Sequence, residues 1–346
     1  MTKKFDVVIG NPPYNSDSQG DATNQMPIYH LFMQAGYEMA DKVVLITPAR
    51  FLFNAGYTPK AWNREMLADP HLSVPFYVDN SDALFPGTDI KGGVAVTYRD
   101  AHRQGEPIGV FSKHSELDSV VSKVDSIATS SLQEAGISND RVYRYTDKMH
   151  EENPQLKALM SKGNQYKLDS RAFTRLAGVF HEHMPTGTKT YVRVLGLDAQ
   201  KKRAFRWINK DYLDGPDALA NYKVALPKAN GSGAFGEVLS APVVLGPGDG
   251  VTGTFITIGS FATEAEAKAC SAYISTKFSR ALLGVLKVTQ DNLARVWKHV
   301  PNQDFSGNSD IDWSKSISDI NQQLYAKYKL VQDEIDFIET NVKPMD

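Results

Sequence analysis

The sequence predicts an α/β fold followed by a separate α+β domain. In roughly the first hundred residues, short apolar segments alternate with segments that have helical spacing, which is typical of a doubly wound α/β unit. Further along the chain, short strands are separated by Gly, Asn and Pro turns and are followed by helices. The length of 346 residues suits two domains, and 42% hydrophobic with 23% charged residues is typical of globular proteins.

The α/β part is predicted from four strands and two helices. The β-branched run at residues 5–9 indicates a buried strand of a parallel sheet, and residues 42–47, 72–78 and 92–98 indicate three more. Residues 60–68 form one expected helix and residues 27–39 the other. The second of these carries its apolar residues at helical spacing, namely Ile28, Leu31, Phe32, Ala35 and Met39.

The α+β part is placed after a boundary near residue 110, giving domains at 1–110 and 111–346. Strands are expected at residues 191–197, 222–227, 242–245 and 254–259. One long helix is expected at residues 263–286, and two closing helices at 314–328 and 331–342.

Composition narrows the class of protein. The formal net charge is −2 with a pI near 6.5, so any nucleic-acid contact needs a local basic patch. The single cysteine, Cys270, excludes an internal disulfide and fits a reducing cytoplasm. No apolar run approaches the roughly 20 residues of a membrane span, and no signal peptide is evident. His181 and His183 lack evident further ligands, so no metal site is predicted.

The most informative motif is Asn11-Pro12-Pro13-Tyr14, directly after the first strand. Ligands of a doubly wound sheet sit at the carboxyl ends of strands, so this loop should face a binding crevice. The Asn11 side-chain oxygen and the Pro12 carbonyl can each accept one hydrogen of an exocyclic amine, and the prolines hold the backbone rigid. Tyr14 offers an aromatic face for a base. The alternative is a plain proline-rich turn.

Residues 5–14 resemble the catalytic motif of S-adenosylmethionine-dependent amino methyltransferases. Residues 46–52 and 84–98 resemble later motifs of adenine-N6 DNA methyltransferases of restriction-modification systems, in the Taq-methyltransferase-like gamma-type group. That resemblance implies that Phe85 stacks on a flipped adenine opposite Tyr14, although Phe85 as an ordinary core residue stays open. Segments at 276–283, 288–291, 300–305 and 311–313 resemble the C-terminal specificity regions of large methylases.

What the resemblance implies is a partial doubly wound, Rossmann-like methyltransferase sheet followed by an α+β target-recognition domain with closing helices. The implied reaction is methyl transfer from S-adenosylmethionine to a flipped adenine of double-stranded DNA. Asn11, Pro12, Pro13 and Tyr14 are the expected catalytic residues.

The cofactor site is the main departure from that group. There the cofactor half precedes the Asn-Pro-Pro-Tyr loop, whereas ten residues precede it here, and no cofactor-binding residue beyond Asn11 is identified. A permuted arrangement would need the glycine-rich segment 243–253, which lacks the expected acidic residue. The expectation is an incomplete S-adenosylmethionine site, completed by a partner chain or self-association, or a truncated remnant. The bare edge of half a sheet favours a partner.

A basic segment with interleaved aromatic residues is the predicted DNA contact, since cations bind phosphates and Asn or Arg can read base edges. It is followed by a loop at residues 231–233 that is expected to be flexible. The alternative is a solvated charged hairpin. The predicted contacts are Lys189, Arg193, Lys201, Lys202, Arg203, Arg206, Lys228 and Asn230.

Two other functions remain open. A non-catalytic DNA-binding subunit or a remnant would explain the missing cofactor half. A protein or RNA amino methyltransferase could share the motif, but such enzymes usually end soon after the catalytic fold, and the long region after residue 110 argues against them.

Overall fold

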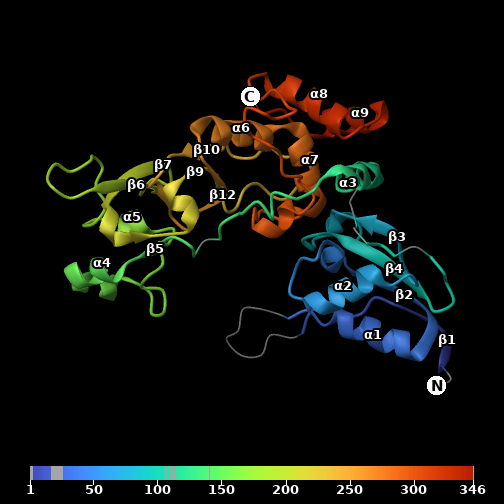
Figure 1. Ribbon diagram of the computed structural model, residues 1–346. Helices are drawn as coiled ribbons and strands as arrows, with labels where there is room; N and C mark the ends of the chain where they lie inside the picture. Colours follow the sequence, from blue (N-terminus) through green and yellow to red (C-terminus); the bar gives the residue numbers. More distant parts are fainter. Residues whose placement is uncertain are drawn as a thin grey trace. The chain divides into compact units, whose positions relative to one another are not determined.

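The computed structural model describes residues 3–16, 26–105, 107–109, 111, 114–139 and 141–345. The chain divides into two compact units, Met1–Asp118 and Ser119–Asp346, called here the first and second unit (Figure 1). Each unit is described by itself. The domain boundary expected near residue 110 stays a prediction.

The first unit contains one sheet of four strands. The strands are β1 (Phe5–Gly10), β2 (Ala40–Pro48), β3 (Leu72–Val78) and β4 (Val94–Asp100), and the helices that accompany them are α1 (Tyr29–Met39), the short η1 (Ala49–Phe53), α2 (Lys60–Ala68) and the short η2 (Ser81–Ala83). All four strands and both α-helices expected from the sequence are therefore present, and the α/β class is confirmed.

The strand order is β1-β2-β4-β3. β1 pairs with β2 in parallel, whereas β4 runs antiparallel to both of its neighbours. The sheet is thus mixed, because the chain turns back through residues 79–93 and needs no crossover helix to reach β4. The carboxyl ends of β1 and β2 and the beginning of β4 meet at one edge.

Helix α1 covers one face of this sheet. A Cβ atom placed on Gly36 of α1 would lie 3.1 Å from a Val43 methyl and 3.8 Å from a Val8 methyl, so the helix approaches β1 and β2 closely. Val43 and Leu45 are buried on that face. The opposite face carries Val44 and Ile46, which are half-exposed.

The expectation that residues 5–9 form a buried strand is wrong. β1 is an edge strand, and the side chains that alternate along it on the face opposite α1 are open to solvent. Phe5 is 56%, Val7 45% and Ile9 76% exposed. A β-branched run is typical of a pleated surface, but it does not reveal whether a neighbour covers that surface.

The apolar residues at helical spacing on α1 are not the ones that the fold buries. The buried residues are Tyr29, Met33 and Gly36. Leu31 and Phe32 are 55% and 44% exposed. The helix therefore presents two large apolar side chains to solvent.

The second unit is an α+β assembly with three small sheets, ordered β10-β9-β12, β11-β6-β7 and β5-β8 (Figure 1). Its strands are β5 (Arg144–Tyr145), β6 (Tyr191–Leu197), β7 (Arg203–Asn209), β8 (Leu213–Asp214), β9 (Tyr222–Pro227), β10 (Val243–Leu245), β11 (Gly250–Val251) and β12 (Phe255–Phe261). Its helices are α4 (Asp147–Glu152), α5 (Ala172–Arg175), α6 (Glu264–Ser275), α7 (Lys277–Leu286), α8 (Ile317–Lys327) and α9 (Gln332–Asn341), while α3 (Ser115–Ile127) runs across the division between the units.

The single helix expected at residues 263–286 is two helices. Thr276 has φ −63° and ψ 152°, so the backbone leaves the helical region there. Its hydroxyl accepts a hydrogen bond from the backbone N–H of Ser279 and so caps the start of α7. Thr276 therefore begins a new helix instead of continuing α6. The two closing helices occur as expected, as α8 and α9.

Candidate functional site

The Asn11-Pro12-Pro13-Tyr14 loop lies at the carboxyl end of β1, as predicted. It is attached to the segment that leads into α1: the backbone N–H of Ile28 donates to the Tyr14 carbonyl at 3.0 Å, and that of Ser16 donates to the Met26 carbonyl at 2.9 Å. The loop is therefore held between β1 and α1. Asn11 itself is exposed.

A cavity of about 190 Å³ opens beside Tyr14, entirely within the first unit. This volume exceeds that of several water molecules at about 30 Å³ each. Its walls come from the motif loop, from the segments after β2 and from the loop before β4. The lining residues are Tyr14, Asn15, Pro27, Tyr29, Pro48, Arg50, Gly56, Tyr57, Asp89 and Ile90.

Two tyrosines of the cavity are shielded from water to different degrees. Burial raises the pKa of Tyr14, and a contact with the Asn11 side chain offsets part of that rise. Burial raises the pKa of Tyr29 to about 12, with opposing contributions from Thr58 and Arg50. Both phenols are therefore neutral at pH 7, and neither can serve there as an anionic base.

The wall formed by the loop before β4 is fixed by Arg50. The Arg50 Nε donates to the Lys91 carbonyl, and the backbone N–H of Ala49 donates to the Gly93 carbonyl at 3.0 Å. Gly93 has φ +79°, and a Cβ atom there would lie 2.3 Å from the Val78 carbonyl oxygen, so only glycine fits. Asp89 and Ile90 are thereby placed at the cavity by backbone contacts.

The predicted aromatic pair is only partly brought together. Tyr14 lines the cavity, whereas Phe85 is half-buried in the same β3–β4 connection and is not among the lining residues. Tyr57 lines it, and sequence reasoning missed it. The one available signal was an aromatic residue between Gly56 and Thr58 in a turn, which gives no indication of its spatial neighbours.

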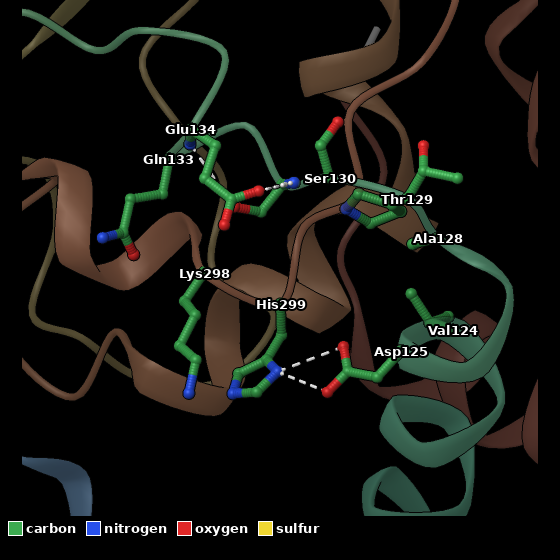
Figure 2. A pocket seen from close by; sticks show the side chains of 11 residues that line it. Val124, Asp125, Ala128, Thr129, Ser130, Gln133, Glu134, Lys298 and His299 are labelled. Atoms are coloured by element: carbon green, nitrogen blue, oxygen red, sulfur yellow. Dashed lines mark hydrogen bonds and ion pairs between the residues drawn. The ribbon is translucent and has the colours of Figure 1, made fainter.

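A larger cavity of about 330 Å³ in the second unit has a different character (Figure 2). The buried His299 ring points its Nδ1 at the Asp125 carboxylate, 3.1 Å away, and Lys298 projects into the same space. Glu134 accepts the backbone N–H of Ser131 at 3.0 Å. The lining contains no large aromatic side chain and mixes charges of both signs, so it does not resemble a base pocket.

The predicted DNA contacts are mostly engaged within the protein. Arg193 forms two hydrogen bonds to Asp249, at 3.1 and 2.6 Å, and Arg206 contacts Glu182 at 2.6 Å. Lys189 lies 3.3 Å from Glu152, and Arg203 donates to the Ala241 carbonyl. These side chains therefore stabilise the sheet of β6 and β7, which is the hairpin that the basic segment forms.

Asn230 and the glycine loop after it also serve the fold. The Asn230 side chain donates to the Val238 carbonyl at 3.0 Å and accepts from Ser240. Glu237 accepts the backbone N–H of Ser232 at 2.8 Å and that of Gly233 at 3.0 Å. Hydrogen bonds therefore hold the loop at residues 231–233 in place, whereas the sequence had suggested that this loop is flexible. Lys228 lies beside it, with its backbone N–H bonded to Thr254.

The remaining cations of the segment stand at the tip of the hairpin. Lys201, at φ +60°, and Lys202 occupy the turn between β6 and β7, and both are exposed. Neither ammonium group has a partner within the described part of the chain. They are the members of the predicted set whose ammonium groups are open to solvent.

We expect the double change Lys201→Gln and Lys202→Gln to weaken duplex DNA binding and to reduce the slope of log K against log salt by about 2, since each phosphate contact contributes about 0.9. A fluorescence-anisotropy titration at several salt concentrations measures both. Lys315→Gln with Lys329→Gln, two exposed lysines elsewhere in the second unit, is the matched control. An unchanged slope in the tip variant would remove these lysines from the DNA contact.

The described residues form no recognisable metal site. No group of three or more His, Cys, Asp or Glu side chains among them could hold a metal ion. No helix in the described ranges is long and apolar enough to cross a membrane. At the carboxyl end of β1, Ile9 and Asn11 are open to solvent.

Comparison with known proteins identifies the amino-terminal segment. Residues 1–85 match the sequence profile described as Eco57I restriction-modification methylase. The matched segment contains β1, the Asn-Pro-Pro-Tyr loop, α1, β2, α2 and β3, so the resemblance stated from the motif is confirmed there. No curated protein sequence matches the chain significantly.

Two solved structures align with the chain at low sequence identity and low TM-score. The Type IIL restriction-modification enzyme MmeI, solved in complex with DNA, aligns with a TM-score of 0.39 and 10% identity, covering 97% of this chain and 56% of that chain. The type IIG restriction endonuclease BpuSI aligns with a TM-score of 0.29 and 11% identity, covering 94% and 49%. The chain thus spans about half the length of these structures.

Proposed function

We propose that this restriction-modification methylase segment holds an adenine of DNA for methylation at N6, with S-adenosylmethionine as the methyl donor. The observation that carries the proposal is the Asn-Pro-Pro-Tyr loop at the carboxyl end of β1 with a cavity beside Tyr14. Asn11 and the Pro12 carbonyl would accept the two amine hydrogens, which directs the nitrogen lone pair toward the donor. The N–CH3 bond would form as the S–CH3 bond of the donor breaks and leaves a neutral thioether, and the surplus amine proton would then pass to solvent water.

The base would leave the duplex to reach this cavity, because the amine of a stacked pair is inaccessible. Tyr14 would contact its face, and Phe85 is the second stacking residue that the family resemblance implies. The hairpin tip with Lys201 and Lys202 would bind the DNA backbone. The protein would act in the cytoplasm, where its DNA substrate lies.

We propose further that β1 and α1 form a docking surface for a polypeptide segment that completes the S-adenosylmethionine site. The open edge of β1 offers unpaired backbone groups to an added strand. Phe5, Val7 and Ile9 on β1, and Leu31 and Phe32 on α1, are large apolar side chains exposed on the two sides of this edge, and exposed apolar groups are typical of interaction surfaces. A strand and helix from the partner would bury them.

Charged substitutions on this surface are expected to prevent the association. Ile9→Asp and Phe32→Asp should each lower partner affinity at least about tenfold, because a buried carboxylate without a partner is costly. Co-purification with proteins encoded beside this chain, and sedimentation of the chain alone, distinguish a partner from self-association. Gln34→Ala, on the same helix, is the control. Full association of both Asp variants would contradict the docking surface.

A methylation assay tests the enzyme proposal as a whole. Plasmid DNA is incubated with labelled S-adenosylmethionine and the chain, with and without its genomic neighbours, and digested DNA is examined for N6-methyladenine. We expect label only when the partner is present, and calorimetry should show weak or no binding of the cofactor by the chain alone. DNA binding without any methyl transfer would favour a non-catalytic subunit, and transfer to protein or RNA would favour that substrate class.

A further inference from the structure

We infer that Tyr57 is a base-contacting residue of the Tyr14 cavity, which binds an aminopurine ring against both tyrosines. The inference rests on the proposed function, because it assigns the same cavity to a nucleobase. Tyr57 belongs to none of the motifs that resemble the methyltransferase family. It is the aromatic residue that the structure places on the cavity together with Tyr14 and Tyr29.

The exposure of Tyr57 is the first observation. The residue is 69% exposed, whereas Tyr29 on the same cavity is 3% exposed and packs in the core. A large aromatic side chain that the fold does not use for its own packing is available to a ligand, and aromatic rings stack favourably on bases of any sequence.

The second observation is that the backbone carrying Tyr57 is rigid. The Lys60 ammonium donates to the Asn54 carbonyl at 2.7 Å and to the Gly56 carbonyl at 3.2 Å. The backbone N–H of Ala55 donates to the Arg50 carbonyl at 2.9 Å. Gly56, at φ +76°, turns the chain against the Arg50 side chain. An exposed aromatic on a fixed loop loses little conformational entropy when it binds.

The flank after Tyr57 is fixed in the same way. Thr58 is buried and donates to the Asn63 Oδ1 at 2.7 Å, and Asn63 in turn donates to the Asn54 side chain at 3.1 Å. The turn is therefore closed by a chain of side-chain hydrogen bonds onto α2. Tyr57 is positioned from both sides while its ring stays uncovered.

Polar groups of the cavity indicate the class of ring. The Asp89 carboxylate, paired with Lys91 at 2.6 Å, and the Asn15 amide both lie on the lining. In the proposed function the two amine hydrogens go to Asn11 and the Pro12 carbonyl, so the Asn15 amide N–H is left to donate to a ring nitrogen such as N1 of adenine, which in hypoxanthine carries a hydrogen instead. The cavity thus suits an aminopurine better than an oxopurine.

The test is an NMR titration of the full chain with adenosine and, separately, with inosine. We expect Tyr57→Ala to raise the Kd for adenosine about 5- to 100-fold, the range for loss of one base–aromatic stack. Tyr57→Phe should stay within about twofold of the wild type, since the ring remains. Phe76→Ala, an exposed aromatic of β3, is the matched control and should have no effect.

The outcomes separate this inference from the proposed function. Adenosine binding that Tyr57→Ala leaves within about twofold of the wild type overturns the role of Tyr57, as does a loss confined to Phe85→Ala. If the wild type binds adenosine and inosine equally, amine recognition and hence the proposed function are contradicted. The difference in Kd between the wild type and Tyr57→Ala still tests the role of Tyr57 in that case. If the wild-type chain binds neither adenosine nor inosine, the inference is overturned.

Discussion

Replacing Asn11 by Ala is expected to lower the rate of methyl transfer by about 10²–10³-fold, the usual effect of deleting one positioned polar group at a reacting centre. The side chain follows β1 directly and is exposed, so the fold does not depend on it. Its role would be to accept an amine hydrogen and hold the nitrogen in line with the donor. The measurement is single-turnover transfer from labelled S-adenosylmethionine to plasmid DNA by the partner-bound enzyme.

The control for this prediction separates chemistry from stability. Asn11→Asp retains an acceptor oxygen and is expected to keep part of the activity, whereas Asn308→Ala, at another exposed asparagine, should leave the rate unchanged. The free energy of unfolding should change by no more than about 0.5 kcal/mol in each variant. An Asn11→Ala enzyme that transfers methyl groups at the wild-type rate would show that the motif is only a turn.

The sequence predicted the strands and helices of the first unit well because each has its own periodicity. It did not predict their surroundings. For α1, residues Leu31 and Phe32 have the spacing of a core-facing stripe, yet Met33 and Gly36 are the residues that meet β2. A helix with two apolar faces does not reveal from its own sequence which face the neighbouring strand covers.

The residues of the candidate site also differ in whether the sequence alone could locate them. The motif loop after β1 could be located because its chemistry is local in the sequence. Tyr57 and Asp89 reach the cavity only through the folding of two connections, and nothing near them in the sequence indicates this. Strand β7 was missed for a related reason: its charged and aromatic residues suggested a surface for DNA, while Arg206 is used to pair with Glu182.

The contact between Lys287 and Glu237 is expected to be a major source of stability in the second unit. The Lys287 side chain is 4% exposed and donates to Glu237, to the Asn230 carbonyl at 2.9 Å and to the Thr289 carbonyl at 3.2 Å. Glu237→Ala would leave the ammonium buried without its counter-charge and would release the loop at residues 231–233. Breaking a buried pair from one side costs about 3–5 kcal/mol, measurable by chemical denaturation.

The pair also predicts the direction of a pH dependence. Burial raises the pKa of Glu237, but the contacts with Lys287 and with the Ser232 and Gly233 N–H groups outweigh it and leave the pKa below its ordinary value. A carboxyl whose pKa is lowered in the folded state adds stability above its unfolded pKa of about 4.3 and loses it as the pH falls through the folded value. Unfolding of the wild type should therefore become easier below about pH 4, and that part of the dependence should vanish in Glu237→Gln.

A double-mutant cycle distinguishes this pair from surface ion pairs. Lys287→Met combined with Glu237→Gln should cost less than Glu237→Ala alone, because no buried charge is left without a partner. Glu264→Ala, which breaks the exposed pair with Lys268, should cost at most about 1 kcal/mol. A Glu237→Ala variant as stable as Glu264→Ala would mean that water reaches Lys287 readily and that the loop beside Asn230 is held by its other contacts.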